Sequence, residues 1–137
     1  MKKLLCLTLF ILLLSLAFAA QISQTEALRV ATDWMRQIAP ANQISELRQV
    51  TNPVQNNQID WYEVTFTEGG FVLISAEDKA VPILAYNPSG SLSSSLPPTN
   101  LQWFLSQYHE EISLIRADET LTAHDGWQAL RSGDYSA

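Results

Sequence analysis

The feature that most constrains the fold is a pair of apolar segments joined by a turn that contains two glycines. Residues 60–66 alternate in character, as a half-buried β-strand requires. Residues 71–76 are almost continuously apolar, and residues 67–70 between them read Thr-Glu-Gly-Gly, a composition typical of tight turns. We therefore predict a β-hairpin. The alternation places Tyr62, Val64 and Phe66 on one side of its first strand, and Trp61, Glu63 and Thr65 on the other.

Two helices are predicted on either side of this hairpin in the sequence. Ser23 and Glu26 fit a capping box, in which Ser23 accepts from the backbone and Glu26 reaches back. The helix that they open has apolar residues every three or four positions and is stopped by Pro40. Thr99 or Asn100 caps a second helix. Its predicted apolar face consists of Leu101, Phe104, Leu105, Tyr108, Ile112 and Ile115.

Two further strands complete the predicted sheet. Residues 44–50 form one of them, and residues 80–86 form the other, which Pro82 confines to an edge because proline has no backbone donor. Residues 87–98 are a loop rich in proline and serine. The order of helix, antiparallel strands and helix predicts an α+β fold, with a twisted antiparallel β-sheet and both main helices packed on one face.

The ends of the chain differ from this central domain. Lys2 and Lys3 are followed by an uncharged run over residues 4–18, and small residues at 17 and 19 suit a signal peptidase. The run is shorter than the roughly 20 residues of a membrane span. We therefore predict a signal peptide at 1–19, a domain at 20–117 and a tail at 118–137 with a short helix around 127–130. The expected product is secreted, to the periplasm or the cell exterior, with no membrane attachment after cleavage.

Charge and cysteine content exclude several classes of function for the exported chain. Loss of Lys2 and Lys3 leaves six basic and 14 acidic residues, a formal charge of −8. Nucleic-acid binding needs clustered basic residues, and here they are scattered. Cleavage also removes Cys6, the single cysteine, and with it any disulfide, thiolate metal site or cysteine nucleophile.

No catalytic or metal-binding motif is recognisable in the remaining residues. The two histidines, His109 and His124, are 15 positions apart, and we place the first on the polar side of the second helix and the second in the tail. Glu110 and Glu111 are sequence neighbours, which is typical of a solvated helix face and not of an acid–base pair. We therefore expect no enzyme activity, no metal and no cofactor.

One stretch resembles a known family. Residues 69–78 read Gly-Gly-Phe-Val-Leu-Ile-Ser-Ala-Glu-Asp, residues 82–86 read Pro-Ile-Leu-Ala-Tyr, and after Gly90-Ser91 residues 98–105 read Pro-Thr-Asn-Leu-Gln-Trp-Phe-Leu. Their order and spacing resemble the pro-domain of streptopain-like cysteine peptidases and the related free-standing streptopain inhibitors. With Ala27, Ala31 and Trp34 of the first helix and Tyr108 of the second, the resemblance covers about residues 22–116. Three positions depart from the family pattern, namely Glu77 for Asp, Ala85 for Gly and Leu92 for Phe.

The resemblance implies an inhibitor that docks on the active-site face of a streptopain-type cysteine peptidase and blocks its Cys-His pair. The family places an Asn at that site, and the matching residue is Asn100, with Pro97, Pro98, Thr99 and Leu101 shaping the segment around it. The papain-like catalytic domain of the peptidases is missing after this segment, so we expect no protease activity. We expect a monomer without cofactor.

Other interpretations stay open at this point. The chain could be a propeptide remnant of a truncated zymogen, or a secreted binding module with another ligand. Asn100 could also be nothing more than the N-cap of the second helix.

Overall fold

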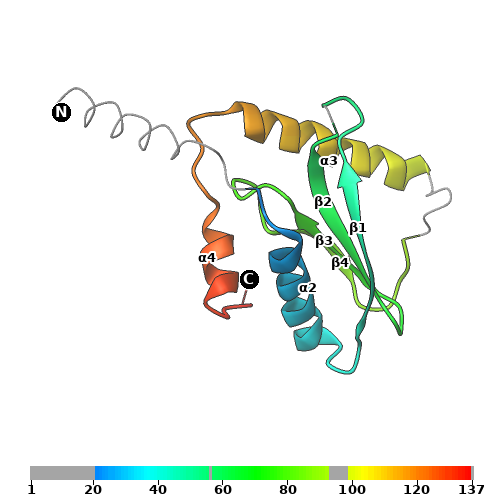
Figure 1. The fold of residues 1–137 in the computed structure, drawn as a ribbon. Coiled ribbons are helices and arrows are strands. Elements are labelled where there is room, and N and C mark those ends of the chain that lie inside the picture. Colours follow the sequence, from blue (N-terminus) through cyan, green and yellow to red (C-terminus); the bar gives the residue numbers. More distant parts are fainter. Residues whose placement is uncertain (1–20, 56, 93–98, 137) are drawn as a thin grey trace, which may run out of the picture.

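A four-stranded antiparallel sheet organises the molecule, and each strand pairs with the next one along the chain (Figure 1). The computed structural model describes residues 21–55, 57–92 and 99–136, so the proposed signal peptide lies outside the described residues. The strands are β1 (Ile44–Thr51), β2 (Ile59–Phe66), β3 (Phe71–Ser75) and β4 (Ile83–Asn87), and the helices are α2 (Gln24–Ile38), α3 (Thr99–Ala117) and α4 (Asp125–Arg131). The predicted α+β class is confirmed.

The β2–β3 hairpin forms as the glycine turn predicts. Trp61 pairs with Ser75, and the register continues to Thr65 opposite Phe71. Gly70 has a φ of +97°, and a Cβ at this position would lie 2.8 Å from the carbonyl oxygen of Pro88. Only glycine fits this conformation and this close approach.

The two main helices lie on opposite faces of the sheet, which corrects the expectation of one shared face (Figure 1). Helix α2 packs with α4 on the face that carries Tyr62, Val64 and Phe66. Helix α3 packs on the other face, against Trp61 and Leu73. The reason is that β2 and β3 are buried on both faces, so β2 is not the half-buried strand that its alternation suggested.

The segment after α3 differs from the expected tail. The predicted short helix is present as α4, but it packs into the main core. Trp127 is completely buried, and its Nε1 donates to the carbonyl oxygen of Ala80 at 3.0 Å. Leu130 lies in the same core, and the hydroxyl of Tyr135 donates to Asp33 of α2 at 3.0 Å. The low apolar density of this segment did not reveal the packing, because its buried apolar residues are few and one of them is a large tryptophan.

The ends of α2 follow the sequence signals in part. Ser23 accepts from the backbone N–H of Glu26 at 3.2 Å, as predicted, and the helix stops before Pro40. The carboxylate of Glu26 does not serve the capping box, since it accepts from Nε of Arg131 at 2.7 Å and ties α2 to α4. No helix in the described part of the chain is both long and apolar enough to cross a membrane.

Candidate functional site

The segment predicted to be inhibitory leads into α3, at the end of this helix that lies far from α4 (Figure 1). Thr99 and Asn100 are exposed and Leu101 is half-buried, whereas Pro97 and Pro98 lie outside the described residues. The helix begins at Thr99, so Asn100 lies in its first turn. The Oδ1 atom of Asn100 accepts from the N–H of Leu101 at 2.9 Å. This corrects the capping assignment, because an N-cap accepts from an N–H two or three residues further on.

An apolar contact holds α3 on its face of the sheet. Ile112 is 1% exposed and forms a core cluster with Trp61 and Leu73, against which Leu105 and Tyr108 also pack. Leu105, Tyr108 and Ile112 belong to the apolar face predicted for this helix. The hydroxyl of Tyr108 donates to the carbonyl oxygen of Leu84 in β4. Leu84 has no partner residue in the β3–β4 register, where Ile74 pairs with Ile83 and Leu73 with Ala85. Tyr108 therefore satisfies a backbone acceptor at an irregularity of the sheet.

A buried carboxylate provides the second attachment of α3. Asp60, at the start of β2, is completely buried. It accepts from the guanidinium of Arg116 and from Nδ1 of His109, both on α3. It also accepts from Nδ2 of Asn52 at 2.8 Å. A buried carboxylate is tolerated only when charge and hydrogen bonds compensate it, and Asp60 has three such partners.

The same network extends along the sheet through Arg116. Its Nε donates to Glu77 Oε2 at 3.2 Å, and its terminal nitrogen donates to the carbonyl oxygen of Ile59. Burial raises the pKa of Glu77 above its ordinary value, while the charge of Arg116 opposes that rise. Arg116 thus joins α3 to two carboxylates and one backbone carbonyl, which fixes the helix relative to the sheet.

Sequence reasoning missed this network and misplaced both histidines. His109 is not on the solvent side of α3, because its ring stacks on Trp61 with a centroid distance of 4.4 Å and faces Asp60. His124 is the N-cap of α4, and its Nδ1 accepts from the N–H of Gly126 at 3.0 Å. One signal in the sequence could have revealed the network. It is the acidic residue Asp60 at the start of β2, a strand that is buried on both faces.

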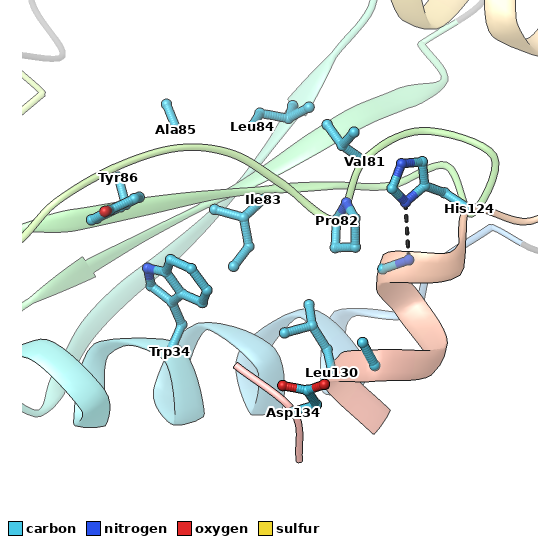
Figure 2. Close-up of a pocket in the computed structure, with 12 residues that line it drawn as sticks. Trp34, Val81, Pro82, Ile83, Leu84, Ala85, Tyr86, His124, Leu130 and Asp134 are labelled. Carbon is cyan, nitrogen blue, oxygen red and sulfur yellow. Dashed lines mark hydrogen bonds between the residues drawn. The ribbon is translucent and has the colours of Figure 1, made fainter. Parts of the chain in front are cut away.

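An apolar groove lies on the opposite face of the sheet from α3, between α2, β4 and α4 (Figure 2). Its volume is about 460 Å³, and Trp34, Ile83 and Leu130 point into it. Trp34 meets the half-exposed Tyr86 edge to face, at a centroid distance of 5.2 Å. The groove is lined mainly by apolar side chains, so it suits an apolar group.

The acidic and imidazole groups around Asp60 are engaged by one another and by Arg116. Within the described ranges, no three histidine, cysteine or carboxylate side chains converge in a way that could hold a metal ion. The most distinctive feature is therefore an exposed helix start on a firmly anchored helix.

Comparison with known families identifies the protein family of this chain. Residues 19–112 match the family model of the Spi protease inhibitor, which spans more than half of the chain. The chain belongs to the Spi protease inhibitor family. Members of this family inhibit proteases, so a protease is the expected partner. Searches among curated proteins and among solved structures found no significant match.

The extent of the Spi family match can be placed on the structure. It covers α2, the whole sheet and α3 as far as Ile112, and therefore includes Asn100. Ala85, which departs from the glycine expected in the resemblance, lies in β4 opposite Leu73. Its φ is not positive, because Asn57 is the one non-glycine residue with a positive φ among the described residues. The alanine is therefore not strained. Helix α4 and one wall of the groove lie beyond the match.

Proposed function

We propose that this Spi family member is an exported inhibitor of a streptopain-type cysteine peptidase, and that it acts by occluding the active site. Family membership supplies the coarser part, inhibition of a protease. The resemblance of residues 69–86 and 98–105 to streptopain pro-domains supports the peptidase type. Because a sterically acting inhibitor needs no chemistry of its own, the absence of a recognisable catalytic motif is compatible with this function.

The observation that carries the mechanism is the exposure of Asn100 on an anchored helix. Asn100 is exposed at the start of α3, and its Oδ1 accepts from the neighbouring N–H of Leu101. Further along the same helix, Tyr108 and Arg116 are bonded to the sheet. A segment that is already ordered loses less conformational entropy on docking than a flexible one, so it binds more tightly for the same contacts.

Export is the second part of the proposal. The basic start and the uncharged run at residues 4–18 support a cleaved signal peptide. The remainder lacks cysteine, so its stability in an oxidising compartment would rest on the core alone. Mass spectrometry of the exported protein tests this directly, with a new amino terminus at Ala20 as the expected result.

Inhibition is tested with the chain from residue 20 onward and an active-site-titrated, mature streptopain-type peptidase. We expect stoichiometric inhibition, with papain as the selectivity control. Asn100→Ala should raise the inhibition constant at least tenfold without changing the unfolding transition, since Asn100 makes no contact that stabilises the core. Gln128→Ala is the matched control, because it removes an exposed amide from α4 on the opposite face. Equal inhibition by both variants and the wild type would remove Asn100 from the mechanism.

A further inference from the structure

The outward face of α3 carries apolar side chains where a surface helix ordinarily carries polar ones. Asn100, Trp103, Gln107 and Leu114 follow one another at spacings of three, four and seven residues, so they lie on one side of the helix. All four are exposed, and the side chains of Trp103 and Leu114 are 64% and 66% exposed. Phe104 borders this stripe and is 45% exposed. Isolated exposed apolar residues are common, but a Trp-Phe pair beside the candidate inhibitory residue is a local concentration.

The aromatic part of this face is held rigidly by the core beneath it. Phe104 packs edge to face on Tyr108 at a centroid distance of 4.9 Å, and Tyr108 packs in the same way on the buried Trp61 at 6.2 Å. The hydroxyl of Tyr108 is bonded to Leu84. The exposed edge of Phe104 is therefore the outer end of an aromatic chain that reaches the core. Pre-organised aromatic residues of this kind are typical anchors of protein interfaces.

The charge on the same helix face is acidic. Glu110 and Glu111 are exposed and form no ion pair with the described residues. The exported chain as a whole has six basic and 14 acidic residues. A partner that approaches this face therefore associates fastest when the corresponding part of its own surface is basic.

We propose that Trp103 and Phe104 are the hydrophobic anchors by which this chain binds its target protease, and that Glu110 and Glu111 face basic residues at the rim of the protease cleft. The inference rests on the proposed function and extends it from Asn100 to a binding face. It identifies the partner surface by its chemistry: an apolar depression next to the active site, with lysine or arginine beside it. Trp103 lies on the exposed line that begins at Asn100, and Phe104 borders this line.

The test measures the inhibition constant of variants against the same streptopain-type peptidase. Trp103→Ala is expected to raise the inhibition constant about 30-fold, which is the effect of losing one interface hot spot. Tyr86→Ala is the matched control, since Tyr86 is an aromatic residue that is 49% exposed and contacts Trp34 of α2 on the opposite face. Unfolding curves of both variants establish that the folded fraction is unchanged at the assay temperature.

The charge is tested separately through the association rate. Glu110→Gln combined with Glu111→Gln should slow association several-fold at low salt and flatten its salt dependence. Glu46→Gln combined with Glu68→Gln changes the net charge equally at exposed positions outside α3, and should have a smaller effect.

The outcomes separate the two hypotheses. If the folded wild type does not inhibit the peptidase, the proposed function and this binding face are both wrong. If the wild type inhibits and Trp103→Ala inhibits equally well, the binding face is wrong while the function stands. Loss of inhibition in Tyr86→Ala alone would move the interface to the groove on the other side of the sheet.

Discussion

The placement of α3 should depend most on Arg116. Its removal gives the sharpest test of the anchoring network, in which Arg116 binds Asp60 and Glu77. Its side chain is 15% exposed, and its partner Asp60 is completely buried. Arg116→Ala leaves the Asp60 carboxylate with His109 and Asn52 as partners and removes its guanidinium partner. Breaking a buried pair from one side costs about 3–5 kcal/mol. A domain of this size is stable by about 5–15 kcal/mol, so the variant should fold but unfold at a much lower urea concentration.

Two companion variants make this prediction specific. Arg36→Ala removes an arginine that is 61% exposed and paired with Asp33 at the surface, so it should change the unfolding free energy by less than about 1 kcal/mol. Arg116→Lys keeps the charge but loses the planar fork that reaches Asp60 and Glu77 together, so it should fall between the two alanine variants. Urea unfolding followed by circular dichroism measures all three. Equal stabilities for Arg116→Ala and Arg36→Ala would refute the reasoning.

Two further predictions concern the rest of the core and its pH dependence. Trp127→Ala should lower the unfolding free energy by about 4 kcal/mol, because a fully buried tryptophan and its bond to Ala80 are lost; an unchanged urea midpoint would show that α4 is not part of the cooperative unit. Burial raises the pKa of Glu77 above 4.5 in the folded state, so the stability that this group contributes is present below pH 4.5 and is lost as the pH rises through the raised pKa. Glu77→Gln lacks this loss, and its stability relative to the wild type should therefore increase between pH 4 and pH 7, whereas the exposed Glu68→Gln should run parallel to the wild type.

Local signals in the sequence predicted the elements well. The hairpin follows from alternation and from two glycines, one of which occupies a position that a side chain could not enter. The start of α2 follows from Ser23, and its end from Pro40. Each of these signals acts over a few residues, so its outcome depends little on the rest of the fold.

The relation between the elements was harder to predict. The alternation places Trp61 on the same side of β2 as Glu63 and Thr65, and this side forms a core with Ile112 of α3. A continuously apolar β3 was the indication that the sheet is covered on both faces. The anchoring network could not be predicted either, because it depends on how distant elements pack. Asp60 and Arg116 are 56 residues apart, and no spacing rule connects a strand start with a helix end.

The residues that we propose for binding lie apart from much of the core that stabilises the domain. On one face of the sheet, α3 carries Asn100 and the exposed pair Trp103 and Phe104. On the other face, α2 and α4 bury Trp127 and the larger apolar cluster. Substitutions in the core that α2 and α4 bury should change how much protein is folded. Substitutions at the exposed positions of α3 should change how tightly the folded protein binds. Arg116 should affect both properties, because it is largely buried and also fixes the helix that carries Asn100. Its variants should therefore weaken inhibition by more than the loss of folded protein explains.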